Sequence, residues 1–236
     1  GAKSVAFNYN DPVIFLEYAV DVAAACREVG VKTVAVTAGY IGEGARPEFF
    51  GAMDAADIDL KGFKEDFYRK LCTASLESVL DTLLYVKHET NTWLEITTLL
   101  IPGENDSSQE IGALSDWAAE KLGQDVPVHF TAFHPDWRMR DISTTPATTL
   151  KRARDIAASA GLRYVYTGNI RDEASQSTYC HGCGTCLIGR DGYTITSWGL
   201  DASGHCTSCG EICPGAFERE PESWGPRRAP LVFAAA

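Results

Sequence analysis

Two short cysteine motifs late in the chain place the strongest constraint on its fold. They run from Cys180 to Gly184 and from Cys206 to Gly210, and each is a Cys-x-x-Cys followed by glycine. Two residues between the cysteines let one tight turn aim both thiolates at a single cation, and the glycine lets backbone N–H groups turn toward the sulfurs. Two such turns supply the four sulfurs that a structural zinc ion prefers. We therefore predict zinc ligands at Cys180, Cys183, Cys206 and Cys209.

Two further cysteines leave an alternative open. Cys186 extends the first motif to C-x2-C-x2-C, and Cys213 extends the second to C-x2-C-x3-C followed by Pro214. The extended spacing is similar to part of a ferredoxin-type run, which would make the region an auxiliary iron–sulfur module for electron transfer. The other interpretation is that both extra cysteines are small buried hydrophobic residues. The doubled motif favours zinc.

Residues 1–170 alternate between strand-like and helix-like patterns. Segments with apolar residues at three- and four-residue spacing separate short apolar runs, and this alternation is typical of parallel βαβ units. The expected strands are Ser4–Phe7, Thr33–Thr37, Ala56–Leu60, Trp93–Leu100, Val128–Phe133 and Tyr164–Thr167.

A partial (β/α) barrel is the favoured arrangement of these strands. Polar residues gather directly after strands, where a barrel assembles its chemistry. No G-x-G-x-x-G follows any strand, which argues against a dinucleotide-binding sheet. The predicted domains are a barrel over 1–170, a cysteine-rich module over 171–219 and a tail over 220–236.

The net charge and the use of cysteine limit the classes of partner and the cellular compartment that the sequence favours. The 236 residues carry a formal net charge of −11, which disfavours a broad surface for nucleic acid or an anionic membrane. No apolar run is long enough to span a bilayer. The cysteine pattern does not indicate a disulfide framework, since Cys26 and Cys72 are isolated and the paired cysteines suit a metal. This pattern fits a reducing compartment, so we expect a cytoplasmic protein. Because the chain starts with Gly1 almost directly before a strand, we expect an N-terminally truncated piece.

Three places near expected strand ends carry candidate site residues. Asp11 could cap the following helix or present its carboxylate to a cation, and Asn10 precedes it. An extended segment directs Asp57, Asp59 and Lys61 to one side, because side chains alternate along a strand. These residues could form a structural ion pair or act as functional groups. His134 follows another strand, where a structural role competes with a functional one. The stretch 101–106 indicates a turn.

Taken in order, these segments resemble the radical S-adenosylmethionine (SAM) superfamily. More narrowly, they resemble the radical SAM enzyme of the AmmeMemoRadiSam system, which is similar to pyruvate formate-lyase activating enzymes. The resemblance covers residues 1 to about 217. The matching stretches are SVAFNYNDPVIFLEYAVDVA, KTVAVTAGYI, ADIDLKGFKEDFYRKLC, EITTLLIPGENDS, VHFTAFHPDWRM, LRYVYTGNI, YCHGCGTCLIGRDGY and CTSCGEICPGAF.

The resemblance implies roles for residues at the barrel rim. Asp11 would hold the SAM amino group, although the family more often has Glu there. Asp59 and Lys61 would line the SAM site, and His134 would lie near the adenosyl group. Asn10 and Thr37 belong to the same set, and Ala38 stands where the family usually has Asn after that Thr.

One feature of the family is absent from the chain. Radical SAM enzymes bind a [4Fe-4S] cluster through CxxxCxxC on the loop after the first strand, and no such motif occurs here. The resemblance therefore implies that the first strand, the cluster loop and its ligands lie upstream of Gly1, and that this piece alone is inactive.

The parent protein would reductively cleave SAM to a 5′-deoxyadenosyl radical that attacks an unknown substrate. The resemblance also implies AMMECR1-type and Memo-type companion proteins. The alternatives are a non-catalytic zinc-ribbon scaffold on a degenerate barrel and the iron–sulfur electron-transfer module.

Overall fold

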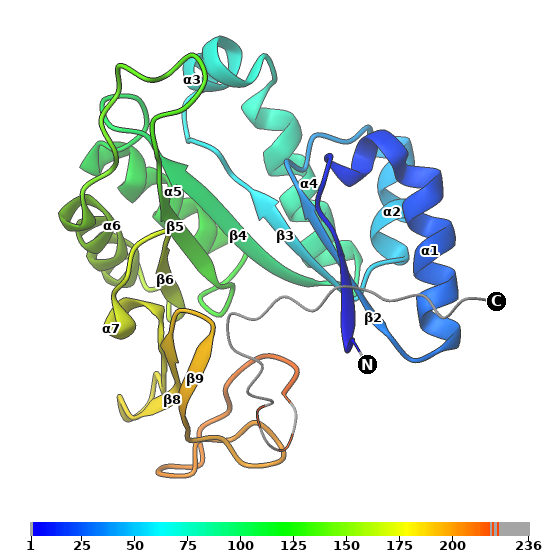
Figure 1. The fold of residues 1–236 in the computed structure, drawn as a ribbon, viewed down its shortest axis with the longest axis vertical. Helices are drawn as coiled ribbons and strands as arrows, with labels where there is room; N and C mark the ends of the chain where they lie inside the picture. Colours follow the sequence, from blue (N-terminus) through cyan, green and yellow to red (C-terminus); the bar gives the residue numbers. More distant parts are fainter. Residues whose placement is uncertain (1, 218, 220, 222–236) are drawn as a thin grey trace, which may run out of the picture. The chain divides into compact units, whose positions relative to one another are not determined.

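The computed structural model describes residues 2–217, 219 and 221 and divides the chain into two compact units (Figure 1). The first unit comprises Gly1–Ile170 and the second Arg171–Ala236. The tail expected over 220–236 lies outside the described residues, apart from residue 221.

The first unit is built on six parallel strands whose order in the sheet follows their order in the chain. A doubly wound sheet reverses its strand order at a switch point, whereas sequential order is that of a barrel arc. The α/β class and the partial-barrel prediction are therefore confirmed. The strands are β1 (Ser4–Phe7), β2 (Lys32–Thr37), β3 (Ala55–Asp59), β4 (Trp93–Leu100), β5 (Val128–Ala132) and β6 (Val165–Gly168).

Helices connect the strands of the first unit and lie on one side of the sheet (Figure 1). The Ser107 hydroxyl caps α5 by accepting a hydrogen bond from the Glu110 amide at 3.2 Å. The helical segments are η1 (Pro12–Phe15), α1 (Leu16–Glu28), η2 (Glu43–Ala45), α2 (Arg46–Gly51), α3 (Glu65–Phe67), the π-turn η3 (Tyr68–Cys72), α4 (Leu76–Glu89), α5 (Ser108–Lys121) and α6 (Ala147–Ser159).

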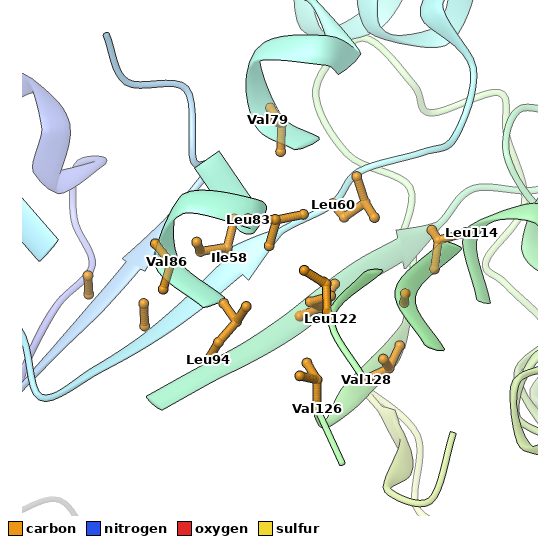
Figure 2. Packing of buried hydrophobic residues seen from close by; sticks show 14 of the residues in the cluster. Ile58, Leu60, Val79, Leu83, Val86, Leu94, Leu114, Leu122, Val126 and Val128 are labelled. Atoms are coloured by element: carbon orange, nitrogen blue, oxygen red, sulfur yellow. The ribbon is translucent and has the colours of Figure 1, made fainter. Parts of the chain in front are cut away.

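The hydrophobic core lies between the helices and one face of the sheet. On each central strand alternate residues are buried, as in the pattern of β4, whose Leu94, Ile96, Thr98 and Leu100 are buried. Figure 2 shows how α4, α5 and the strands contribute to this cluster, with Ile58, Leu60, Val79, Leu83, Val86, Leu94, Leu114, Leu122, Val126 and Val128 labelled. The other strand residues therefore point to the opposite face, which we call the inner face.

Asn105 joins the ends of two strands. Its side chain is 2% exposed, and its Oδ1 accepts a hydrogen bond from the Ile101 amide at 2.7 Å. Its Nδ2 donates to the carbonyls of Lys61 (2.6 Å) and Leu99 (2.9 Å). The residue predicted only to lie in a turn thus fixes the segment after β3 against the end of β4.

The second unit contains a three-stranded antiparallel sheet of β7 (Thr178–Tyr179), β8 (Cys186–Asp191) and β9 (Thr194–Trp198), preceded by α7 (Glu173–Gln176). The β8–β9 hairpin turns at Gly192, whose φ is +59°. Across the described parts of both units, every helix is too short or too polar to cross a membrane.

We predict that Asn105→Ala destabilises the first unit by about 2–3 kcal/mol, because it strips partners from one buried amide and two carbonyls. Asp106→Ala is the matched control, since it removes only an exposed hydrogen bond to the Gly103 amide in the same turn. It should cost less than about 1 kcal/mol. Urea unfolding measures the free energy of unfolding of both variants. Equal losses of stability would contradict the role of Asn105 in joining the two strand ends.

Candidate active-site rim and metal centre

Asp11 links the ends of β1 and β2. Its Oδ1 accepts hydrogen bonds from the Val13 amide at 3.0 Å and the Thr37 hydroxyl at 2.8 Å, and its Oδ2 accepts from the Ala38 amide at 2.8 Å. The residue is therefore both the helix cap and a rim carboxylate, so the two interpretations of the sequence do not exclude each other. Asp11 accepts its hydrogen bond at position 38 from the backbone amide of Ala38. This contact therefore does not depend on the Asn side chain that is expected at this position from the family resemblance.

The backbone after β2 is tightly constrained. Gly39 has a φ of +67°, and a Cβ there would lie 2.7 Å from the Ile58 side chain. Only glycine fits this position without strain. The turn directs the Ala38 amide toward Asp11. Asn10, by contrast, is exposed.

Asp59 and Lys61 form an ion pair at the end of β3, with Lys61 Nζ 2.7 Å from Asp59 Oδ2. The side chains are 34% and 39% exposed, so the pair is open to solvent and to a ligand. The Lys61 amide is held by the Tyr68 hydroxyl at 3.0 Å, and its carbonyl by Asn105. The strand end is thus rigid while its charged groups stay accessible.

The rim residues predicted from sequence are brought together in pairs. Asp11 bonds to Thr37, and Asp59 bonds to Lys61. His134 follows β5 and is exposed. Within the described part of the chain, no hydrogen bond or ion pair joins His134 to the other four residues. Parallel strands end at the same edge of the sheet, so all five lie along one rim.

The metal centre has the geometry of a single four-coordinate ion. The Sγ atoms of the four paired cysteines lie within 4.8 Å of one another. Cys180 and Cys209 approach to 3.5 Å, and Cys183 and Cys206 to 3.7 Å. Zn–S bonds of about 2.3 Å in a tetrahedron put the sulfurs roughly 3.8 Å apart. The donor set and its spacing therefore fit one tetrahedral ion.

The two cysteine turns have the same backbone hydrogen bonds. The amides of Gly184 and Gly210 donate to the carbonyls of Cys180 and Cys206, each at 2.8 Å. Both glycines have positive φ, +73° and +79°. The amides of the leading cysteines donate in turn to the carbonyls of residues 185 and 211, again at 2.8 Å. The repeated CxxCG pattern thus produces two equivalent metal-binding turns.

Neighbouring groups shift the pKa values of two of these thiols in opposite directions. A backbone hydrogen bond at Glu211 lowers the pKa of the Cys209 thiol, but contacts with the other three cysteines raise it to about 12. The hydroxyl and amide of Thr185 lower the pKa of the Cys183 thiol to about 6. A thiolate is the form that binds metal. Cys186 and Cys213 are not members of the described four-sulfur group: Cys186 Sγ lies 3.7 Å from the Ser197 hydroxyl, and Cys213 is buried.

The inner face carries a polar group of residues, of which only Asp57 is a candidate from the sequence. Thr97 Oγ1 on β4 donates to both carboxylate oxygens of Asp57 on β3, at 2.9 and 3.0 Å. Glu95 Oε2 on β4 lies 2.7 Å from His129 Nε2 on β5. The His129 ring stacks on Tyr166 of β6 with centroids 5.0 Å apart. We call Asp57, Glu95, Thr97, His129 and Tyr166 the inner-face group.

The signal for this group is present in the sequence. Asp57, Glu95 and His129 stand at the half-buried positions of strands whose alternate residues are fully buried. Charged residues at every second position of parallel strands indicate a second polar face. Locating their partners needs the register, in which Asp57 pairs with Glu95 and His129 with Tyr166.

No protein-family model matches the chain. An uncharacterized protein of Methanocaldococcus jannaschii is 36% identical over 208 residues, which are 88% of this chain and 61% of that protein. The chain therefore spans less than two thirds of the length of this relative.

Solved structures share the fold of the first unit. A domain of a pyruvate-formate lyase-activating enzyme from Bacteroides vulgatus is similar with a TM-score of 0.62, at 19% identity over 72% of this chain and 100% of that one. A radical SAM methyltransferase from Sphaerobacter thermophilus follows with a TM-score of 0.54, at 14% identity over 66% and 48% of the two chains. SuiB of Streptococcus suis bound to S-adenosylmethionine has a TM-score of 0.52, at 13% identity over 71% and 38%. The first unit thus has the barrel fold of radical SAM enzymes.

We predict that Asp57→Asn stabilises the first unit at pH 7. Burial raises the pKa of the Asp57 carboxyl, and Asp59 and Glu95 raise it further, against the opposing effects of Thr97 and His129. A raised folded-state pKa means that the ionised group favours unfolding once pH exceeds the carboxyl range. The gain should therefore vanish near about pH 3, where the carboxyl is protonated in both states. Thermal unfolding as a function of pH is the measurement.

Asp54→Asn is a control variant for which we expect a change in stability opposite in sign to that of Asp57→Asn. Burial works to raise the pKa of Asp54, but hydrogen bonds and charge from Lys32 and Thr33 lower it. Its stabilising contribution is present above the carboxyl range and lost as pH falls. Asp54→Asn should therefore destabilise the protein at pH 7, and a common sign for both variants would contradict the assignment.

Proposed function

We propose that this chain is the larger part of a radical SAM enzyme that generates a 5′-deoxyadenosyl radical from S-adenosylmethionine. The observation that carries the proposal is the Asp11 carboxylate, fixed at the ends of β1 and β2 in a fold shared with SAM-bound SuiB. Bound to a reduced [4Fe-4S] cluster, SAM supplies the radical. This chain's residues would bind and orient SAM.

The donor set at the rim suits the SAM amino group. A carboxylate has about four acceptor positions, and three on Asp11 are filled by Val13, Thr37 and Ala38. One position remains for an ammonium group, and the other three bonds hold the carboxylate in place. Asp59 and Lys61, on the same rim, would contact other polar groups of SAM, with Asn10 and His134 as further candidates.

The cluster ligands would come from a preceding segment. The chain has no CxxxCxxC, and its relative is considerably longer. β1 lies at an edge of the sheet, so its outer side is available to a further parallel strand. We propose that this strand and a cluster loop precede Gly1 in the parent protein, and that the chain alone does not cleave SAM.

The same proposal covers the setting of the enzyme. It would act in the cytoplasm on a substrate still to be identified, in the AmmeMemoRadiSam system with AMMECR1-type and Memo-type companions. The resemblance of the chain over residues 1 to about 217 supports this assignment.

Zinc is the proposed occupant of the cysteine centre. Four thiolates whose sulfurs lie within 4.8 Å of one another can enclose one ion, whereas a cubane cluster places each thiolate on a different iron and spreads the sulfurs. With all four positions filled by protein, the ion would stabilise the second unit and leave no site for catalysis.

The first test uses the longer protein, prepared without oxygen from the full upstream reading frame. It should contain the visible absorbance of an iron–sulfur cluster and should convert SAM to 5′-deoxyadenosine after reduction. An upstream sequence without CxxxCxxC would leave the scaffold alternative and end the enzyme proposal.

In that protein, Asp11→Ala should weaken SAM binding by about tenfold or more, because it removes the charge-assisted bond to the amino group. Asp11→Glu should retain most of the affinity, since it restores the family's usual carboxylate. Calorimetry measures both, and circular dichroism checks that each variant folds. Unchanged affinity in the alanine variant would refute the role of Asp11.

The second test concerns the metal. We expect one zinc per chain, and removal by a chelator should abolish amide-exchange protection over residues 178–213 while leaving residues 32–168 protected, because metal binding supplies folding free energy. Cys206→Ser should act like the chelator, whereas Cys186→Ser, outside the four-sulfur group, should retain zinc. Iron together with acid-labile sulfide would favour the electron-transfer alternative.

A further inference from the structure

His129 is held in one orientation by a short chain of hydrogen bonds on the inner face. The Trp93 indole N–H donates to Glu95 Oε1 at 2.9 Å, and Glu95 Oε2 lies 2.7 Å from His129 Nε2. The stacked Tyr166 ring fixes the plane of the imidazole. In many protein sites a carboxylate that is itself held by a hydrogen bond orients a histidine ring. The second ring nitrogen of that histidine is then directed at a ligand.

The tautomer follows from the partners of Glu95. An ionised carboxylate can only accept hydrogen bonds, so His129 Nε2 must carry the proton of this pair. In the neutral ring, Nδ1 then has a free lone pair. Within the described part of the chain, Nδ1 makes no hydrogen bond, and the side chain is 30% exposed.

The place of His129 separates it from the rim. It is the second residue of β5, opposite Thr97 of β4 and Tyr166 of β6, whereas His134 of the rim follows the carboxyl end of the same strand. The inner face below the rim is open, since the side chains of His129 and Glu95 are 30% and 36% exposed. A molecule that extends from the rim along the inner face would contact this group.

We infer that His129 Nδ1 hydrogen-bonds the substrate of the proposed radical reaction, with Glu95 and Trp93 as positioning residues. The inference rests on the proposed function. The substrate would present a hydroxyl, amine or amide N–H group to this nitrogen. Thr97 on the adjacent strand β4, and Asp57 on β3, which bonds to Thr97, would contact the same molecule.

Two isosteric variants separate the contact from the fold. Asparagine places its side-chain oxygen where Nδ1 lies, and glutamine places its amide where Nε2 lies. Both remove the ring and its stacking on Tyr166, so they lose the same packing. His129→Asn keeps an acceptor for the substrate, whereas His129→Gln keeps only the bond to Glu95.

The experiment uses the longer protein with SAM, a reductant and, as probe, an extract of the source cells grown in deuterated water. Total 5′-deoxyadenosine reports SAM cleavage, and its deuterium content reports hydrogen abstraction from the substrate. We expect all variants to form the nucleoside within about twofold of wild type. Deuterium content should fall about tenfold in His129→Gln and much less in His129→Asn.

The outcomes test the proposed function and the role of His129 separately. No nucleoside from the wild type would refute the proposed function and the inference with it. Nucleoside without deuterium from the wild type would refute the inference alone, since the complete cell extract would then hold no hydrogen donor. Equal deuterium loss in both variants, or loss of total nucleoside, would show that His129 serves packing or SAM binding.

A second measurement needs only this chain. Nitrogen-15 NMR should show the neutral His129 ring protonated at Nε2, with the signal assigned by its absence from His129→Asn. Glu95→Ala should mix the two tautomers. A proton on Nδ1 in the wild type would overturn the inference, because that nitrogen could not then accept a hydrogen bond.

Discussion

The six parallel strands of the first unit follow one another in sequence order and are joined by right-handed crossovers. Every connecting helix must therefore lie on the same face of the sheet. This constraint governs the rest of the first unit. It puts one hydrophobic core between the helices and the sheet, and it leaves the opposite face without helices. It also brings the ends of all six strands to one edge, where Asp11, Thr37, Asp59 and Lys61 are found. The polar rim and the polar inner face are both consequences of strand order.

The inner face is not arranged for stability. Asp57 and Glu95 are paired in register on adjacent strands, and like charges directly opposite are destabilising. Burial keeps the pKa of Asp57 raised in spite of the Thr97 hydroxyl. Apolar residues at these positions would avoid that cost. The helix-facing positions one residue away are occupied by Ala56, Ile58 and Leu94, so the same strands do provide apolar surface where packing requires it. The contrast within each strand favours a ligand-binding role for the inner face.

Local patterns were sufficient to predict the six strands of the first unit and the four grouped cysteines, but not the partners of side chains. Each expected strand lies within one residue of the observed strand at either end, because the apolar runs are bounded by turn residues. The four cysteines were predictable because each pair is local to one turn. Asn105 looked like an ordinary turn residue, since its contacts with Lys61 and Leu99 depend on how two strands are placed. The Glu95–His129 pair was missed for the same reason: it requires the register of β4 and β5. The roles assigned to the rim residues remain predictions.

The metal centre shows how little a small unit needs beyond correct turns. Each cysteine turn already has its two backbone hydrogen bonds, and a glycine with positive φ closes it. The turns are therefore formed locally, and an ion has only to join them. A module of this size buries too little apolar surface to be stable alone, so the free energy of four metal–sulfur bonds becomes its folding free energy. Because those four bonds complete a tetrahedron, no open position is left for a substrate. Among the described residues, the polar groups left to contact a ligand then lie at the rim and on the inner face of the first unit.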